Sequence, residues 1–406
     1  MSGIRVLVSG ASIAGPALAH WLRRRGAEVT VVERAPGLRP GGQAVDARGV
    51  TKEVIRLMGL DEAVRAARTR TAGAHTVDAD GNVLETFSAE DDGGDGYITE
   101  IEILRGDLSQ VLYDDTRDGV EYVFGDRIAE LTQDGSGVDV TFASGGSRRF
   151  DLVIGADGLH SSVRGMVFGP RERFVRHLGH VLAFYSVPNE FGLDRWLLDY
   201  QEPGRSACLR PIGDATRAMA MFSFTAADFD VDYRDIEAQK QLLRERMADF
   251  AWLTPRILAH VDDTPDFYLD QVAQVVMDRW SNGRVGLLGD AAFSSSPLSG
   301  QGTGLALIGA YLLAGELAAA GWDPAAGFAR YEELMRPFVE ANQEIGRLHA
   351  KMRGIPDPDA EPAAEPAVEP DTEWLTDLVQ RAVNGVELPD YAGVPDSGPS
   401  VTSVSR

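Results

Sequence analysis

The sequence predicts an α/β protein in which a Rossmann-like domain is interleaved with a second domain built on a mixed sheet. Three observations lead to this fold class. Residues 5–9 and 28–33 are short apolar strand-like runs on either side of a helical segment, 16–25, so the chain opens with a βαβ unit. A buried-strand pattern returns at 284–288 and leads into a helix rich in Ala and Leu at 304–320. A long strand-rich stretch lies between these two ends of the chain.

Composition limits what the protein can bind. The 406 residues are 44% hydrophobic and 25% charged, which is ordinary globular composition and enough for two sizeable cores. Lys and Arg total 39 against 62 Asp and Glu, so the formal charge is 39 − 62 = −23. Such a charge repels phosphate backbones and anionic membranes, so we expect no nucleic-acid or membrane partner. The single cysteine, Cys208, excludes an intramolecular disulfide and a Cys-rich zinc site, and we predict no metal.

The apolar N-terminal stretch is not predicted to be a secretory signal. Residues 4–22 are interrupted by Gly10, Ser12 and Gly15, and the basic cluster follows the stretch instead of preceding it. No uninterrupted apolar run of about 18 residues occurs elsewhere. We therefore expect a cytoplasmic protein, either a monomer or a homodimer.

The remaining patterns divide the chain further. Helices are expected at 51–67 and 104–114, a hairpin at 76–88, and a small antiparallel meander at 121–150. Further strands at 195–200 and 217–224 and a helix at 237–250 belong to the second domain, and a short helix is expected at 373–383. We assign residues 1–72, 99–175 and 275–353 to the first domain, 73–98 and 176–274 to the second, 354–371 to a linker, and 372–406 to a C-terminal helix and tail.

The turn between the first strand and helix has the form of a dinucleotide fingerprint. In the sequence from Gly10 to Gly15, Gly10 permits a tight turn and Gly15 lets the helix pack closely on the sheet. Ser12 replaces the usual second glycine, although its hydroxyl can donate to a phosphate. The start of the helix would present free N–H groups and a positive dipole end to a pyrophosphate, and we include Ser12, Ile13 and Ala14 among the predicted contacts.

An acidic residue supports this interpretation. Glu33 ends the second strand, 23 residues after Gly10, where a carboxylate binds ribose hydroxyls and repels a 2′-phosphate. The unit therefore predicts FAD or NAD at this position and argues against NADP. We include the neighbouring Arg34 among the predicted contacts.

Two later motifs carry a resemblance to a known family. The first runs from Asp151 through Gly155, Asp157 and Gly158 to Arg164. The second is Gly289-Asp290-Ala291-Ala292 followed by Pro297-Leu298-Ser299-Gly300-Gln301-Gly302. They resemble the Asp-Gly and Gly-Asp motifs of group A flavoprotein monooxygenases of the para-hydroxybenzoate hydroxylase type, which include aromatic polyketide hydroxylases and tetracycline-modifying enzymes. This family implies FAD as the bound dinucleotide.

The resemblance also implies site residues. It places Asp290 on the ribityl chain of FAD, and Pro297, Gly300, Gln301 and Gly302 beside the flavin ring. Arg105 matches the family arginine near the flavin chain or pyrophosphate, Arg48 lies in a segment that passes the flavin, and Asp157 and Arg164 are second-rank contacts. Where members often carry histidine after Gly-Asp-Ala-Ala, this chain has Phe293, so a role for that histidine cannot be transferred.

The expected reaction follows from the resemblance. NADPH or NADH, bound transiently, reduces FAD, and the reduced flavin reacts with O2 to a C4a-hydroperoxide that oxygenates an aromatic or polyketide-like small molecule. No catalytic acid or base is identified, and we name Tyr200, Arg210 and Met221 as candidate substrate contacts. Met219 and Met221 alternate with Ala220 and Phe222, a pattern that fits either a pocket roof or ordinary core packing. Two alternatives stay open: a flavin reductase or dehydrogenase without oxygen insertion, and a non-catalytic flavin-binding protein.

Overall fold

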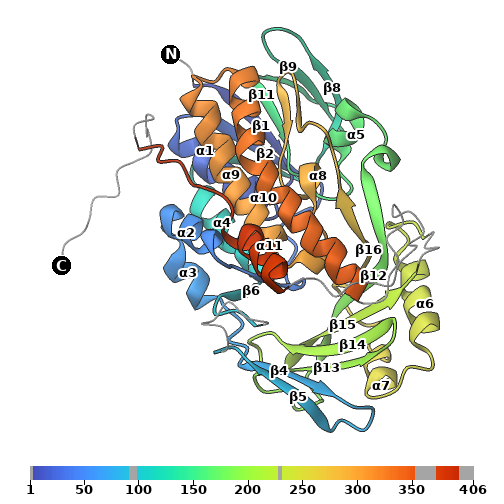
Figure 1. Ribbon diagram of the computed structural model, residues 1–406. Helices are drawn as coiled ribbons and strands as arrows, with labels where there is room; N and C mark the ends of the chain where they lie inside the picture. Colours follow the sequence, from blue (N-terminus) through green and yellow to red (C-terminus); the bar gives the residue numbers. More distant parts are fainter. Residues whose placement is uncertain (1–2, 91–97, 227–230, 353–371, 393–406) are drawn as a thin grey trace, which may run out of the picture.

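Two main β-sheets organise the protein, and the longest helices pack across the larger domain (Figure 1). The computed structural model describes residues 3–90, 98–226, 231–352 and 372–392. In the first sheet β1 pairs in parallel with both β2 and β11, so the chain reverses its winding direction beside β1 and leaves a crevice at the carboxyl ends of these strands. The order of this six-stranded sheet is β17 (Ser281–Asn282), β18 (Val285–Leu287), β11 (Leu152–Gly155), β1 (Arg5–Ser9), β2 (Glu28–Glu33) and β7 (Glu121–Phe124).

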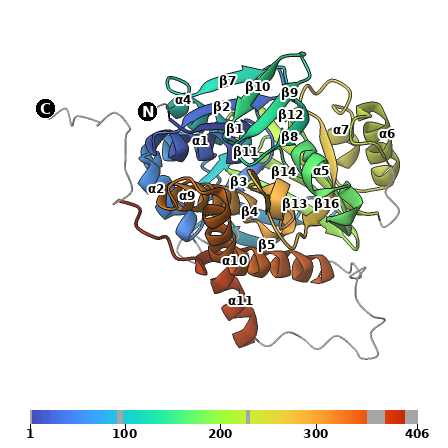
Figure 2. The ribbon, with the colours of Figure 1, turned by 90° about the horizontal axis from the view of Figure 1, so that it is seen from above.

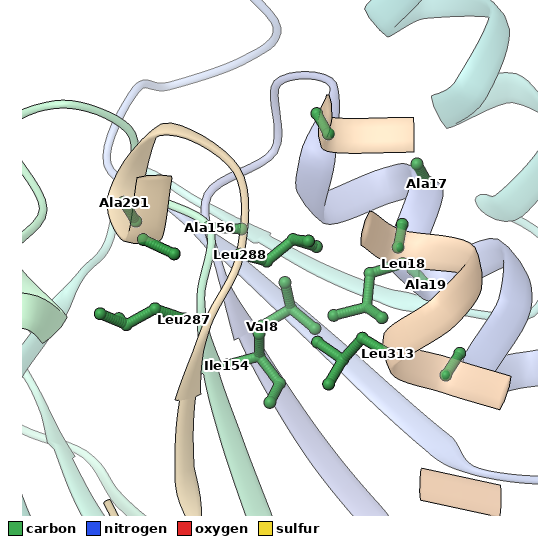
Figure 3. Packing of buried hydrophobic residues seen from close by; sticks show 14 of the residues in the cluster. Val8, Ala17, Leu18, Ala19, Ile154, Ala156, Leu287, Leu288, Ala291 and Leu313 are labelled. Carbon is green, nitrogen blue, oxygen red and sulfur yellow. The ribbon is translucent and has the colours of Figure 1, made fainter. Parts of the chain in front are cut away.

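The predicted βαβ unit is confirmed. Helix α1 (Ala14–Arg24) follows β1 and begins two residues earlier than the pattern indicated. Its inner face is apolar at helical spacing, which drives it onto the sheet. Figure 3 shows residues of three strands and two helices meeting in one buried layer: Val8, Ile154, Leu287, Leu18 and Leu313.

Three helices form a layer over this sheet (Figures 1 and 2). Helix α9 (Gly302–Ala319) lies between α1 and α10, and it is long and apolar enough to cross a membrane, but 78% of it is buried inside the protein. The 29-residue α10 (Pro324–Met352) was not identified from the sequence. The expected C-terminal helix is confirmed as α11 (Thr372–Asn384), and Asn342 of α10 donates to the carbonyl of Ala382 at 2.9 Å.

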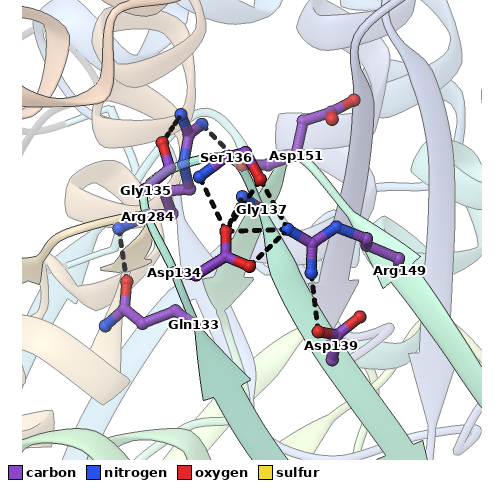
Figure 4. A network of polar contacts seen from close by, with 9 residues as sticks. All are labelled: Gln133, Asp134, Gly135, Ser136, Gly137, Asp139, Arg149, Asp151 and Arg284. Atoms are coloured by element: carbon purple, nitrogen blue, oxygen red, sulfur yellow. Dashed lines mark hydrogen bonds and ion pairs between the residues drawn. The ribbon is translucent and has the colours of Figure 1, made fainter.

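The predicted meander is shorter than expected. Strands β8 (Ile128–Gln133), β9 (Val138–Phe142) and β10 (Ser147–Phe150) form it, whereas β7 leaves it and pairs in parallel with β2. Figure 4 shows what joins its strands: Arg149 forms ion pairs with Asp134 at 2.7 Å and Asp139 at 2.6 Å.

The second main sheet has seven strands and belongs to the lower half of Figure 1. Helices α6 (Ile236–Met247) and α7 (Thr254–Leu258) cover one face, which buries Ala220, Phe222 and Phe224. The opposite face is turned away from these helices. The strand order is β16 (Tyr268–Val275), β12 (Val175–Pro188), β15 (Arg217–Thr225), β14 (Arg205–Pro211), β13 (Trp196–Glu202), β4 (Gly73–Val77) and β5 (Val83–Ser88).

Strands β12 and β16 connect the two halves. Val175 and Val275 belong to the core of the first sheet, whereas Val181 and Leu269 on the same strands belong to the core under α6. The predicted domain boundaries at 175–176 and 274–275 fall within these two strands. The division into domains remains a prediction.

The other elements mostly follow the predicted pattern. The expected helix 51–67 is divided into α2 and α3 because Gly59 adopts the left-handed conformation at φ 77° and ends the first. The predicted linker 354–371 lies outside the described residues. The remaining elements are α2 (Val50–Met58), α3 (Asp61–Ala66), α4 (Arg105–Thr116), α5 (Ser162–Phe168), the 3₁₀ turn η2 (Arg171–Arg173), α8 (Asp290–Phe293), the 3₁₀ turn η3 (Pro297–Ser299), and a two-stranded sheet of β3 (Ala44–Asp46) and β6 (Glu102–Leu104).

Candidate cofactor site

The glycine turn after β1 is packed as tightly as a dinucleotide fingerprint requires. A Cβ on Gly15 would lie 1.9 Å from the Gly10 carbonyl oxygen, and one on Gly10 would lie 2.4 Å from the Ala156 carbonyl oxygen. Gly10 also has a φ of 110°, which other residues rarely adopt. Ile13 precedes α1 without a side-chain cap. The free N–H groups of this helix start are therefore available to an anion.

Glu33, at the end of β2, binds the backbone of the glycine turn. Its two carboxylate oxygens accept hydrogen bonds from the Ala11 N–H at 2.8 Å and the Ala35 N–H at 2.9 Å. A carboxylate has about four acceptor positions, so it can still accept hydroxyl donors from a ribose. Arg34, beside it, is solvent-exposed.

Arg105 is a half-buried cation that faces this turn. Its Nη1 donates to the Ser12 hydroxyl at 3.1 Å, and its side chain lies against Gly42. Burial, with a further contribution from the charge of Arg39, lowers the pKa of the Arg105 guanidinium to about 10. Among the described residues no carboxylate forms an ion pair with it. A buried guanidinium without a counter-ion is unfavourable, so this position fits a phosphate ligand.

Asp290 lies at the carboxyl end of β18. Gly289 turns the chain with a φ of 64°, and a Cβ added to it would lie 3.2 Å from the Ala14 Cβ. Asp290 is solvent-exposed, yet burial raises the pKa of its carboxyl above the usual range. A side chain that is both surrounded by protein and open to solvent lies in a recess.

The loop after Asp290 borders the same recess. Pro297 and Gly300 are exposed, whereas Gln301 is 5% exposed, and Gly300 is left-handed at φ 68°. A Cβ on Gly302 would lie 4.0 Å from the Asp290 carboxylate. Helix α9 begins at Gly302 without a side-chain cap and so presents a second free helix start to this space.

The Asp-Gly motif has a partly structural role. Asp157 accepts hydrogen bonds from Ser162 N–H at 2.8 Å and from the Ser161 and Ser162 hydroxyls, so it supports the start of α5, whose N-cap is Ser161. Arg164 is 1% exposed and donates to the carbonyls of Leu159 at 2.6 Å and Ala291 at 2.9 Å. Arg164 thus connects the Asp-Gly motif to the Gly-Asp motif. A direct contact of either residue with a cofactor remains a prediction.

Arg48 is held by its own segment. Its Nη2 forms an ion pair with Asp46 at 2.9 Å, and Asp46 also accepts from the Thr99 hydroxyl. The following Gly49 packs against Val383 and Asn384 of α11. The role of Arg48 at the flavin remains a prediction.

The structure therefore brings together most of the predicted cofactor residues near the carboxyl ends of β1, β2 and β18. The arrangement offers two helix starts, one half-buried cation and two carboxylates, which suits a dinucleotide with an unphosphorylated adenosine ribose. The residues of this candidate cofactor site are Gly10, Ser12, Ile13, Ala14, Gly15, Glu33, Arg105, Asp290, Pro297, Gly300, Gln301 and Gly302.

Comparison with known proteins decides the family. A family model described as an FAD binding domain matches residues 3–345. The chain is also 40% identical over 388 residues to a flavin-dependent monooxygenase from an unknown prokaryotic organism, with 95% of this chain and 99% of that protein covered. The chain belongs to the group A family of FAD-dependent monooxygenases. This monooxygenase thus has FAD as its cofactor and the mixed α/β fold of the para-hydroxybenzoate hydroxylase type.

Other relatives extend the comparison. An uncharacterized protein of Mycobacterium tuberculosis is 50% identical over 339 residues, covering 83% of this monooxygenase and 91% of the relative. Among solved structures, the tetracycline destructase Tet(51) is 36% identical with a TM-score of 0.83, and the match covers 96% of this chain and all of that one.

The predicted substrate contacts do not all lie on one face of the second sheet. Tyr200 lies in the core under α6, with its ring 5.0 Å from that of Phe250 and its hydroxyl bonded to Glu202. Arg210 forms a buried ion pair with Glu102, which connects the second sheet to β6. A substrate contact of either residue remains a prediction. Met221 lies on the face opposite α6, where its predicted role remains open.

Two further charged or polar residues near the candidate site were not identified from the sequence. Arg39 lies close enough to Arg105 for its charge to affect the pKa of that guanidinium. Tyr268 on β16 is 44% exposed, yet burial and the charges of Asp270 and Asp290 raise the pKa of its phenol. A single arginine in a loop and a single tyrosine in a strand belong to no sequence motif that would mark them as part of the site.

Proposed function

We propose that this chain is an NAD(P)H- and O2-dependent hydroxylase of an aromatic or polyketide-like small molecule. Bound FAD would supply the electron transfer from nicotinamide and the activation of O2. Family membership supports the flavin and the oxygenase class. The electron donor and the substrate class are the parts that we infer.

One observation carries the proposal: strand β16 of the second sheet, which includes Tyr268, packs against α8, which begins at Asp290. The face of the second sheet opposite α6 and the candidate cofactor site therefore border the same space. A ligand in this space would lie between the flavin motifs and the sheet.

The chemistry of that sheet face fits a large, mostly apolar ligand with a few polar groups. Phe184 stacks on Tyr268 with ring centroids 6.0 Å apart, and Met219 and Met221 point to the same side of the neighbouring strand. Methionine adapts its shape to irregular apolar ligands, and a phenol offers one hydrogen bond. The likeness to a tetracycline destructase also supports a fused-ring substrate.

The chain's own residues would position the cofactor. Arg105 and the start of α1 would bind the pyrophosphate, Glu33 a ribose, and Asp290 the ribityl hydroxyls. The start of α9 would favour negative charge on the flavin ring. The second sheet would cover the reaction and keep water out.

The test begins with the flavin spectrum of the purified protein. NADPH and NADH oxidation and O2 consumption are then followed with phenols, tetracyclines and linear polyketides. We expect at least one fused-ring compound to accelerate both NAD(P)H oxidation and O2 consumption. Conversion without O2 consumption would support the reductase alternative, and bound FAD without turnover of any donor would support the non-catalytic one.

A further inference from the structure

A chain of polar side chains connects the second sheet to the loop after β11. Tyr268 and Asp270 lie at alternate positions on β16, so their side chains share the face of the sheet opposite α6. The Tyr268 hydroxyl donates to Asp270 Oδ2 at 3.2 Å. The Nε2 of His160, from the loop after β11, contacts the same oxygen at 2.6 Å. The chain therefore begins at the sheet face, where Tyr268 is 44% exposed, and ends in the first domain.

The contacts around this chain hold it in place. The His160 imidazole stacks on the ring of Tyr233 with centroids 4.0 Å apart, and the Tyr268 ring stacks on Phe184 at 6.0 Å. Asp270 is 7% exposed, and its other oxygen accepts from the next backbone N–H at 2.8 Å. Within the described ranges no lysine or arginine forms an ion pair with Asp270. Its carboxylate is therefore stabilised by the hydrogen bonds of this chain.

The direction of the hydrogen bond at Tyr268 follows from these contacts. A carboxylate only accepts, so the single hydrogen of the phenol is directed at Asp270. Burial and the charges of Asp270 and Asp290 raise the pKa of the phenol well above its usual range, so Tyr268 keeps this hydrogen. Toward the recess the phenol then presents only the lone pairs of its oxygen. A polar ligand group that faces Tyr268 must be a hydrogen-bond donor.

We propose that Tyr268 accepts a hydrogen bond from a hydroxyl of the substrate and so selects phenols and enols over their ethers. This inference rests on the proposed function, which places the substrate between this sheet face and the flavin motifs. His160 and Asp270 are positioning residues, because they direct the phenol hydrogen away from the ligand. An ether oxygen at the same place would oppose its lone pairs to those of Tyr268, and a site built for one hydrogen bond rejects the analogue that lacks it.

The test compares a phenol with its methyl ether in the FAD-loaded protein without NAD(P)H. Changes in the flavin absorption spectrum give the Kd values of 2-naphthol and 2-methoxynaphthalene. We expect the unmodified protein to bind the naphthol about five- to tenfold more tightly, as one neutral hydrogen bond allows, and Tyr268→Phe to abolish this preference. Tyr185→Phe is the matched control, because the Tyr185 hydroxyl donates to the Ile257 carbonyl under α6. It should keep the preference.

Two variants of His160 test the positioning role. His160→Gln keeps an N–H donor for Asp270, whereas His160→Phe keeps only a ring that can stack on Tyr233. Without that donor, Asp270 is expected to take up a proton, donate to Tyr268 and turn the phenol hydrogen toward the ligand. The glutamine variant should therefore retain the preference for the naphthol, and the phenylalanine variant should lose it while its Kd for FAD stays unchanged.

The inference is overturned if the unmodified protein binds neither probe or binds both equally, or if Tyr268→Phe leaves the ratio of the two Kd values unchanged. It is also overturned if the Tyr185 control loses the preference equally, or if Tyr268→Phe weakens the binding of FAD instead. Turnover is measured separately. A protein that prefers the naphthol but oxidises NAD(P)H with no compound would contradict the proposed function and leave the Tyr268 contact standing.

Discussion

At the scale of single residues, charges that are surrounded by protein fall into two groups. Glu102 has its partners inside the protein: Arg210 and the hydroxyls of Thr69 and Thr71. The half-buried Arg105 and the solvent-exposed Asp290 have no ion-pair partner among the described residues. The first group stabilises the folded chain. The second group belongs to the candidate cofactor site. Substitution should therefore lower the stability of the folded chain in the first group and the affinity for FAD in the second.

Asp290→Asn should weaken FAD binding and stabilise the protein without FAD. Loss of a charged acceptor costs about 1.5–3 kcal/mol, which is roughly ten- to a hundredfold in Kd. Because burial raises the pKa of Asp290, the unliganded fold loses stability as pH rises from the unfolded value near 4 through the folded value. The amide avoids that loss, so the gain in denaturation midpoint should be present at pH 7 and fade near pH 4.

Asp61→Asn is the control for this prediction, since Asp61 also begins a helix but pairs with Arg65 at the surface. It should leave the FAD Kd unchanged. Equal loss of FAD by both variants would contradict the role of Asp290. Phe293→Ala is unsuitable as a control because Phe293 is 1% exposed and packs on Trp280 at 4.7 Å.

Arg210→Met should destabilise the protein by about 3–5 kcal/mol at pH 7, because it leaves the Glu102 carboxylate buried without a cation. Burial alone would raise the pKa of Glu102, but Arg210 and the two threonine hydroxyls hold it below the usual range. The pair's stabilisation is therefore present above the unfolded pKa near 4.3 and is lost as pH falls through the lower folded value. Urea denaturation at pH 7 and pH 4.5 should show a smaller difference at the lower pH. A difference below 1 kcal/mol at pH 7 would contradict the structural role.

At the scale of elements, the turns between strands and helices control the cofactor site. The glycine turn was predictable because its requirement is local: Gly10 and Gly15 are separated by a fixed spacing between a strand and a helix. The path of β7 was not, since its partner β2 is distant in the sequence. Tyr200 shows a similar limit, because alternation tells which residues share a face of a strand but not which face meets the cofactor.

Part of the candidate cofactor site could also be predicted from the sequence. Glu33 and Asp290 could be placed because each ends a strand of a recognisable motif. Arg39 and Tyr268 could not, because only the packing of the two sheets brings them to the same recess. The partner of Arg210 was missed for the same reason: Glu102 is 108 residues away.

Gly15→Ala should separate α1 from β1. The added Cβ would lie 1.9 Å from the Gly10 carbonyl oxygen, so we expect a loss of about 1–3 kcal/mol or more and a loss of FAD from the purified protein. Gly165→Ala is the matched control, because that helical glycine has open space around it and alanine should add up to about 1 kcal/mol. Thermal denaturation and the flavin content measure both. A Gly15→Ala protein that keeps its FAD and stability would refute the close packing.

At the scale of the whole molecule, two sheets connected by β12 and β16 enclose the end of the first sheet where the motifs converge (Figure 1). In the proposed function, the cofactor lies on one side of this space and the sheet face with Phe184, Met219, Met221 and Tyr268 on the other. Family membership supports the bound FAD. The proposal that this sheet face binds the substrate depends on which compound the protein converts.

The most direct test of the central claim is turnover under ¹⁸O2 with FAD-loaded protein, NADPH and the best compound from the substrate panel, followed by mass spectrometry. The account predicts one ¹⁸O atom in each product molecule and one NADPH oxidised per product formed. A product that contains no ¹⁸O, or a purified protein that cannot be loaded with FAD, would contradict it.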